Sequence, residues 1–109
     1  MQIFIMKKSE IFQIILDVVC GVIEIDTSDV FSACKSEDIV TARCLIAESC
    51  RDYNMHNKHI QQFLQFKSHN SVRGLLAMYD SRKAFDRSFR FYANTVAHEL
   101  DKTIPANCQ

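Results

Sequence analysis

Glycine and proline are almost absent from this chain, and no other feature of the sequence limits its fold as strongly. The 109 residues include two glycines and one proline. A fold built from β-strands needs many tight turns, which draw heavily on these two residues. Their scarcity therefore favours α-helices. With 48% hydrophobic residues, a chain of this length can bury one modest core, so we expect a single all-α domain over 1–109.

Hydrophobic residues recur at spacings of three and four along most of the chain, which is the pattern of helices with one buried face. The first such segment follows Ser9, which we expect to cap it, and is apolar around more than half of its circumference. Its β-branched residues leave a strand over Val18–Ile25 as the alternative. A short helix near residue 30 should follow, capped by Asp26 or Thr27.

Cap-forming residues and breaks in the apolar pattern divide the rest of the chain. Ser36 should begin a long helix that ends near Tyr53, and Ser68 should begin another that ends near Arg82. A short helix over 58–65 lies between them. A polar interval over 80–83 precedes a last amphipathic helix, which stops before Pro105. The pattern leaves open whether the last two helices form one kinked rod.

These segments predict a compact bundle of five to six helices. Residues 9–102 should form the helical domain, preceded by an N-terminal extension over 1–8. A frayed tail should follow over 103–109.

The stretch Lys67-Ser68-His69-Asn70-Ser71-Val72 joins two of these helices. Two short helices linked by a tight turn, the second opening with polar side chains, form the arrangement of a helix-turn-helix, whose second helix reads DNA. An ordinary helical hairpin gives the same pattern and is much commoner. The stretch alone therefore favours the hairpin, and a DNA-binding role needs further support.

Charge is distributed unevenly along the chain, although the formal net charge is zero. Residues 1–54 contain five basic and nine acidic residues, whereas residues 58–90 contain seven basic and two acidic residues. The basic half includes the stretch 67–72, as a DNA-facing surface would require. A normal solvated surface can also carry a local excess of this size.

The order of these elements resembles the C-terminal DNA-binding domain of the bacterial replication initiator DnaA. That family has a short helix of the form D-L-L-S, a long helix with an A-R-x-x-A-like stretch, and a helix-turn-helix signature close to G-R-D-H-[ST]-[ST]-V. Their counterparts here are Asp29-Val30-Phe31-Ser32, Thr41-Ala42-Arg43-Cys44-Leu45-Ile46-Ala47, and the stretch 67–72. The resemblance covers about residues 10–102, and its spacing runs without gaps from Asp29 to Val72.

Two departures from the family pattern affect what the resemblance implies. The family places glycine in the turn, where this chain has Gln65 and Phe66, so the turn should differ or be strained. The family's loop after the short helix is rich in arginine for the minor groove. Here the loop 33–38 contains Lys35 and two acidic residues, so minor-groove contact should be weaker.

The resemblance implies a DNA-binding site made of Lys35, Arg43, Lys67, Ser68, His69, Asn70, Ser71 and Arg73. His69, Asn70 and Ser71 would meet base edges in the major groove. Lys67 would contact phosphate, and Arg73 would contact phosphate or guanine. Arg43 would touch the DNA backbone or serve the fold, and Lys35 would remain for the minor groove.

Other chemistry finds little support in the sequence. Cys44, Cys50, His56 and His59 do not have the spacing of a zinc finger, and no phosphate-binding glycine loop is present. We therefore expect no enzyme activity, metal, cofactor or nucleotide. The five cysteines suit reduced thiols in the cytoplasm, and the longest apolar run, 11–25, is too short to span a membrane.

The sequence thus predicts a protein that binds double-stranded DNA in a sequence-dependent way, without ATPase activity. The alternative is a protein-interaction module that keeps the fold but has lost DNA affinity. Its partner would be a second copy or another protein.

Overall fold

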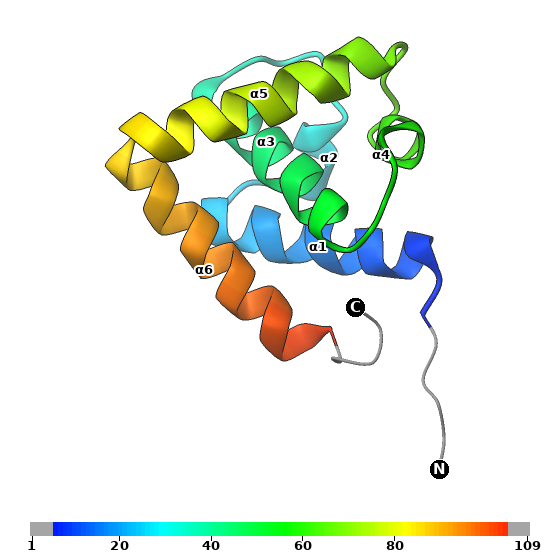
Figure 1. Ribbon diagram of the computed structural model, residues 1–109, viewed down its shortest axis with the longest axis horizontal. Helices are drawn as coiled ribbons and strands as arrows, with labels where there is room; N and C mark the ends of the chain where they lie inside the picture. The colour runs from blue at the N-terminus through cyan, green and yellow to red at the C-terminus, as the bar shows by residue number, and fades with distance from the viewer. Residues whose placement is uncertain (1–5, 105–109) are drawn as a thin grey trace.

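The structure is a computed structural model that describes residues 6–104, apart from the side chain of His69. Within this range the chain forms six helices and no strand. They are α1 (Lys8–Ile23), α2 (Thr27–Val30), α3 (Glu37–Asp52), α4 (Asn57–Phe63), α5 (His69–Phe85) and α6 (Arg87–Thr103) (Figure 1). The predicted all-α bundle of five to six helices is confirmed. Most of the expected extension and tail lies outside the described residues.

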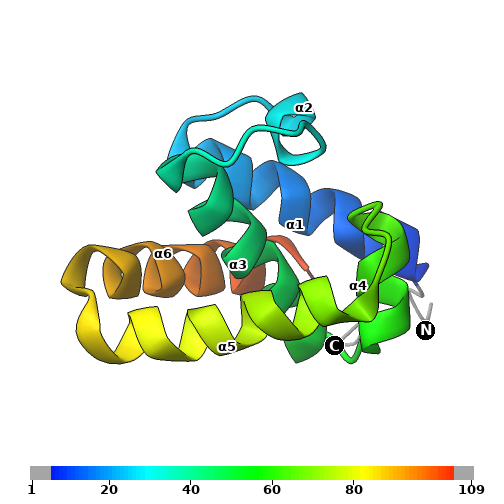
Figure 2. The same ribbon diagram turned by 90° about the horizontal axis from the view of Figure 1, so that it is seen from above.

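Helix α3 forms the centre of the bundle, because it contacts every other helix. All residues from Thr41 to Cys50 are buried, so the whole circumference of this segment is covered. Helices α2 and α5 lie on opposite sides of the molecule (Figure 2). The core is completed by apolar side chains of the surrounding helices, including Ile15, Ile60 and Val96, each at most 1% exposed.

The helix starts agree with the predicted caps at three places and differ at one. Asp26, Ser36 and Ser68 occupy the N-cap positions of α2, α3 and α5. Helix α1 begins before Ser9, which is therefore not its cap. Instead the Glu10 carboxylate accepts a hydrogen bond from the backbone N–H of Lys7 at 3.4 Å. The strand alternative is wrong, since α1 continues as helix to Ile23.

The helix predicted to end near Arg82 continues three residues further, through the polar interval at 80–83. Helix α5 runs through it to Phe85, and the single residue Asp86 separates α5 from α6. The Asp86 carboxylate accepts a hydrogen bond from the backbone N–H of Phe89 at 3.1 Å, which caps α6. Arg90 donates to the carbonyl oxygens of Lys83 and Ala84 at the end of α5. The two helices therefore meet at a sharp elbow rather than forming one rod (Figure 1).

The turn between α4 and α5 uses a left-handed residue that is not glycine. Gln65 has a φ of 62°. This conformation places the Cβ atom close to the following carbonyl oxygen, at a cost of roughly 1–2 kcal/mol. Hydrogen bonds on both sides hold the turn, since the Phe66 N–H donates to the Gln61 carbonyl oxygen and the Gln61 side chain donates to the Phe66 carbonyl oxygen. We expected a turn without glycine to differ from the family's turn or to be strained, and the backbone at Gln65 is strained.

No helix within residues 6–104 has both the length and the apolar character needed to cross a membrane.

Candidate nucleic-acid interface

The start of α5 carries most of the residues that the sequence analysis assigned to DNA. The Ser68 hydroxyl accepts a hydrogen bond from the backbone N–H of Asn70 at 3.1 Å, so its role is to cap the helix. Asn70, Ser71 and Arg73 are exposed, as is Lys67 in the turn. His69 opens the helix, and its side chain lies outside the described part. The fold therefore gathers polar side chains at one exposed helix end.

The opposite face of α5 explains this exposure. Val72, Leu75 and Leu76 are buried, with exposed fractions of 0%, 8% and 8%. A period of 3.6 residues per turn places these apolar positions on one side and Asn70 and Arg73 on the other. The core thus fixes the orientation of α5 and leaves its polar face in solvent.

Arg43 has a different position from the α5 residues. It is 9% exposed, and its guanidinium donates hydrogen bonds to three carbonyl oxygens of the α2–α3 segment. These are the oxygens of Val30 at 3.0 Å, Cys34 at 3.0 Å and Ser32 at 2.6 Å. Five guanidinium N–H groups in a rigid fork suit this task. Of the two roles considered for Arg43, its contacts serve the fold.

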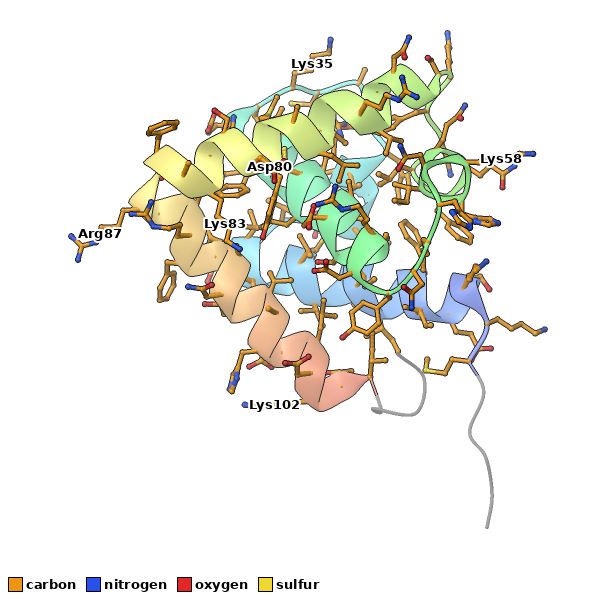
Figure 3. The ribbon with its side chains drawn as sticks, in the orientation of Figure 1. Lys35, Lys58, Asp80, Lys83, Arg87 and Lys102 are labelled. Atoms are coloured by element: carbon orange, nitrogen blue, oxygen red, sulfur yellow. The ribbon has the colours of Figure 1, made fainter. Side chains whose placement is uncertain are left out.

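Lys35 lies in the segment that Arg43 holds. Its side chain projects toward solvent (Figure 3). Within the described residues, no contact joins it to the exposed side chains of α5. The structure therefore brings together six of the eight assigned residues, five at consecutive positions 67–71 and Arg73 two positions later on α5. Lys35 and Arg43 lie elsewhere.

An open hollow of about 560 Å³ adjoins this helix end. We call it the basic groove, and it is lined by Arg51, Met55, His56, Asn57, Lys58 and Arg73. Arg51 on α3 pairs with Glu48 at 2.8 Å while its side chain stays 47% exposed, and Lys58 and Arg73 are also exposed. Three elements thus bring basic side chains to one concave surface. Such a surface concentrates positive potential, which attracts phosphate groups.

The sequence analysis did not select Arg51, His56 or Lys58. The basic excess over 58–90 pointed toward Lys58, but no spacing rule places Arg51 beside Arg73. These residues are 22 positions apart in the chain. They meet because α3 packs against α5, a tertiary contact that a single sequence does not encode in any local pattern.

The remaining cations of the basic half are mostly engaged within the protein. Arg82 donates to Thr41 at 2.9 Å and pairs with Glu37 at 3.1 Å, and the Lys83 ammonium lies 5.6 Å from the Tyr79 ring centroid. Arg90 caps α5. The available basic side chains are therefore Lys58, Lys67 and Arg73, near the α4–α5 turn, and Arg87 at the α5–α6 elbow. Figure 3 shows Lys58 and Arg87 at these two places.

Cys44 and Cys50, the two cysteines considered as metal ligands, have the properties of core residues. Cys44 and Cys50 are fully buried, and burial raises their pKa to about 11 and about 12, respectively. Thiols with such a pKa stay protonated at neutral pH and are poor nucleophiles. Among residues 6–104, no group of three His, Cys, Asp or Glu side chains is arranged to hold a metal ion.

Comparison with protein-family models, with curated proteins and with solved structures gives no match for this chain.

Proposed function

We propose that this protein binds double-stranded DNA in a sequence-dependent way, with the start of α5 in the major groove, and that it has no ATPase activity. The observation that carries the proposal is the exposed polar end of α5 beside the basic groove. Major-groove readers need both features: polar side chains that reach base edges, and cations that hold the phosphates. This role also follows from the DnaA-like order of elements and would place the protein in the cytoplasm.

The proposed contacts follow from side-chain chemistry. Asn70 can pair with adenine through two hydrogen bonds, and Ser71 can donate or accept at several bases. His69 would add a third base contact. Lys58, Lys67 and Arg73 would hold phosphates on either side of the helix end, and each phosphate contact releases counterions.

The rest of α5 limits how much sequence can be read. Gly74 and Ala77 are exposed on the next turns, and neither has a polar side chain. Exposed Asp80 follows, and its charge would repel the phosphate backbone. Readout should therefore be confined to the first turn of α5, with a short recognition site.

The decisive experiment is selection of bound duplexes from a random library by the purified protein. A consensus sequence is expected. Asn70→Ala or His69→Ala should then lower the discrimination between this consensus and random duplex, whereas equal loss on both would contradict base reading. Recovery of no consensus would overturn sequence-dependent binding.

The phosphate role needs a matched comparison of charges. Lys58→Ala, Lys67→Ala and Arg73→Ala should each weaken binding to all duplexes and reduce the slope of log K against log salt by about one. Arg87→Ala removes the same charge at the elbow, outside the proposed interface, and should leave the slope unchanged. If all four variants behave alike, the attraction is diffuse and the α5 site is not supported.

A protein-interaction module is the second candidate, and one observation favours it. Phe85 at the elbow is 88% exposed and Phe91 on α6 is 67% exposed. Large aromatic side chains in solvent are typical of protein-binding surfaces. Binding to heparin or random duplex across a salt series separates the two functions. Lack of salt-dependent retention would favour the interaction module, and Phe85→Ser would then be the variant expected to lose the partner.

A further inference from the structure

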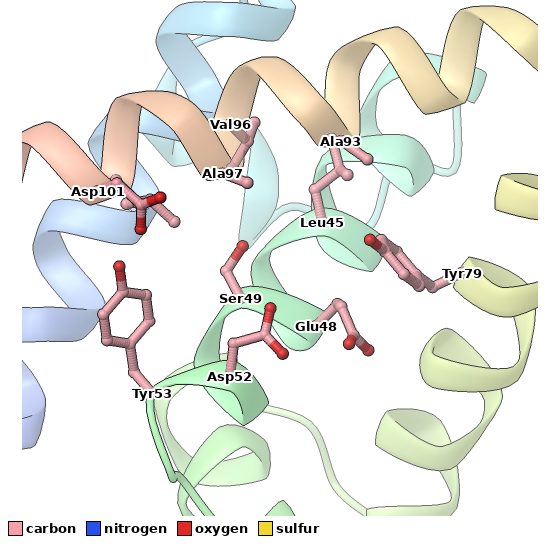
Figure 4. Close-up of a pocket in the computed structure, with 11 residues that line it drawn as sticks. Leu45, Glu48, Ser49, Asp52, Tyr53, Tyr79, Ala93, Val96, Ala97 and Asp101 are labelled. Atoms are coloured by element: carbon pink, nitrogen blue, oxygen red, sulfur yellow. The ribbon is translucent and has the colours of Figure 1, made fainter. Parts of the chain in front are cut away.

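A cavity of about 140 Å³ lies between α3, α5 and α6, formed by different residues from the basic groove. Its wall includes the apolar side chains of Leu45, Ala93, Val96 and Leu100. Polar side chains from α3, α5 and α6 also line it (Figure 4). The combination of apolar wall and converging polar groups is the usual form of a small-molecule site.

Three carboxyl groups line this cavity: Glu48 and Asp52 on α3, and Asp101 on α6. Glu48 is only 8% exposed. Burial raises the pKa of Glu48 and of Asp52, which means that the fold holds their negative charges at an energetic cost. Burial, Asp101 and Asp52 together raise the pKa of Tyr53, whose ring lies between α3 and the end of α6 (Figure 4).

Protein cations offset this negative charge only in part. Arg51 pairs with Glu48 at 2.8 Å, but its side chain is 47% exposed and it lines the basic groove rather than this cavity. Lys83 is close enough to lower the pKa of Asp52, and its ammonium lies 5.6 Å from the Tyr79 ring centroid. Exposed Asp80 adds a further negative charge that acts on Glu48. The cavity therefore keeps a negative potential.

Ser49 provides an independent indication of a ligand. The residue is only 8% exposed, and its hydroxyl points into the cavity (Figure 4). No side chain or backbone group among the described residues forms a hydrogen bond with this hydroxyl. The oxygen atom is not itself sealed from solvent, so the hydroxyl can form a hydrogen bond with a molecule that enters the cavity.

The polar groups define the chemistry of the ligand. Three carboxyl groups, a serine hydroxyl and two tyrosine hydroxyls accept hydrogen bonds, so they suit a cation with several N–H donors. Within the described residues the acidic groups are not arranged to hold a metal ion. The apolar wall suits a hydrocarbon stem. A cavity of about 150 Å³ accommodates benzene, which limits a ligand in this space to roughly six non-hydrogen atoms.

We propose that this cavity binds a short aliphatic ammonium group, with the charged nitrogen lying among the carboxyl groups of Glu48, Asp52 and Asp101 and the Ser49 hydroxyl, and the methylenes against Leu45 and Val96. The source of the group is a free amine or diamine, or the lysine side chain of a peptide. The proposal does not depend on DNA binding, since it uses none of the residues assigned to DNA.

Titration with 1,4-diaminobutane, followed by calorimetry and by backbone amide NMR shifts, tests the proposal. Saturable binding is expected, with the largest shifts at 45–53, at Tyr79 and at 93–101. Butan-1-ol has a similar stem without the charge and should bind at least tenfold more weakly, because charge-assisted hydrogen bonds are worth about that factor or more. A short lysine-containing peptide forms the second arm. Binding of the peptide alone would support the ammonium chemistry and assign its source to a protein.

Matched variants localise the binding. Asp101→Asn removes a cavity carboxylate and Glu99→Gln removes a carboxylate two positions away on α6, where it pairs with Lys102 at 3.7 Å outside the cavity. Asp101→Asn should weaken diamine binding about tenfold, and Glu99→Gln should leave it within twofold. Ser49→Ala should also weaken binding while keeping the fold, which far-ultraviolet circular dichroism checks.

Two results would overturn the proposal. One is the absence of saturable binding by both diamine and peptide. The other is binding that Glu99→Gln weakens as much as Asp101→Asn, since this would indicate general attraction to acidic surface rather than occupation of the cavity.

Discussion

The guanidinium of Arg43 donates a hydrogen bond to the carbonyl oxygen of Ser32 at 2.6 Å, across 11 positions of the chain. This contact ties the middle of the central helix α3 to the segment that follows α2. Two further bonds from the same side chain reach Val30 and Cys34. The α2–α3 segment therefore takes its shape from α3, and Lys35 is carried by a loop that Arg43 fixes.

Replacing Arg43 should affect stability more than any change at an exposed arginine. Arg43→Ala should lower the free energy of unfolding by about 3 kcal/mol, because three carbonyl oxygens lose their donor in a partly buried site. Urea unfolding measures this, with exposed Arg73→Ala expected within about 0.5 kcal/mol of the unchanged protein. An unchanged stability for Arg43→Ala, with weaker DNA binding, would instead make Arg43 a DNA contact.

The cap at Ser68 gives a second prediction. Ser68→Ala removes the hydroxyl that accepts from the Asn70 N–H, and should lower the free energy of unfolding by about 1 kcal/mol. Ser68→Asp supplies another cap acceptor and should restore most of this loss. Thermal unfolding of the three proteins compares them. If Ser68→Asp is as unstable as Ser68→Ala, capping is not the role of this hydroxyl.

Local chemistry predicted the helices well. Ser36 and Ser68 marked helix starts because their side chains favour N-cap positions, and the spacing of Val72, Leu75 and Leu76 gave the buried face of α5. The predicted end of α5 near Arg82 is three residues short of the observed end at Phe85, and there is a physical reason. Arg82 and Lys83 use long side chains to contact Glu37 and the Tyr79 ring, so polar residues there are compatible with a packed helix.

The candidate sites could be predicted from the sequence less completely than the helices. The start of α5 could be identified because its residues are adjacent in the chain. The basic groove joins Arg51 to Arg73, and the cavity joins Ser49 to Asp101. These pairs depend on how α3, α5 and α6 pack, and no periodicity within one helix specifies that packing. The two sites could therefore be recognised only from the fold.

Gly74 is a position where a substitution should stabilise the fold. Gly74 lies inside α5 with a φ that is not positive, and a Cβ atom built there meets nothing within 4 Å. Gly74→Ala should raise the free energy of unfolding by about 1 kcal/mol, because alanine has a higher helix propensity. Urea unfolding tests this, and no gain would mean that the new methyl group meets an obstacle in solution.

At the α4–α5 turn, introducing a glycine should stabilise the fold. Gln65 has a φ of 62°, where glycine avoids the steric cost of a side chain. Gln65→Gly should raise the free energy of unfolding by about 0.5–1 kcal/mol after the entropy of the unfolded chain is included. Gln65→Ala keeps the Cβ atom and should give no such gain. Equal effects of the two changes would show that the turn is not strained.

The stability of the fold should depend on pH through Glu48, which lines the acidic cavity. Burial raises its pKa above the ordinary value of 4.5, against the smaller opposing effect of Arg51. The folded protein therefore holds a proton on Glu48 at pH values where the unfolded chain has released it. The stabilising contribution of protonated Glu48 is present in full below pH 4.5, and it is lost as the pH rises through the raised folded pKa.

Glu48→Gln tests this linkage, because glutamine has a similar shape, still offers an acceptor to Arg51 and does not titrate. We expect the stability of Glu48→Gln relative to the unchanged protein to increase as the pH rises from about 4 to 7, measured by urea unfolding at each pH. Ser49→Ala alters the same cavity without removing a titrating group, so its difference should stay constant with pH. A constant difference for Glu48→Gln as well would show that the Glu48 carboxylate is charged in the fold at no energetic cost.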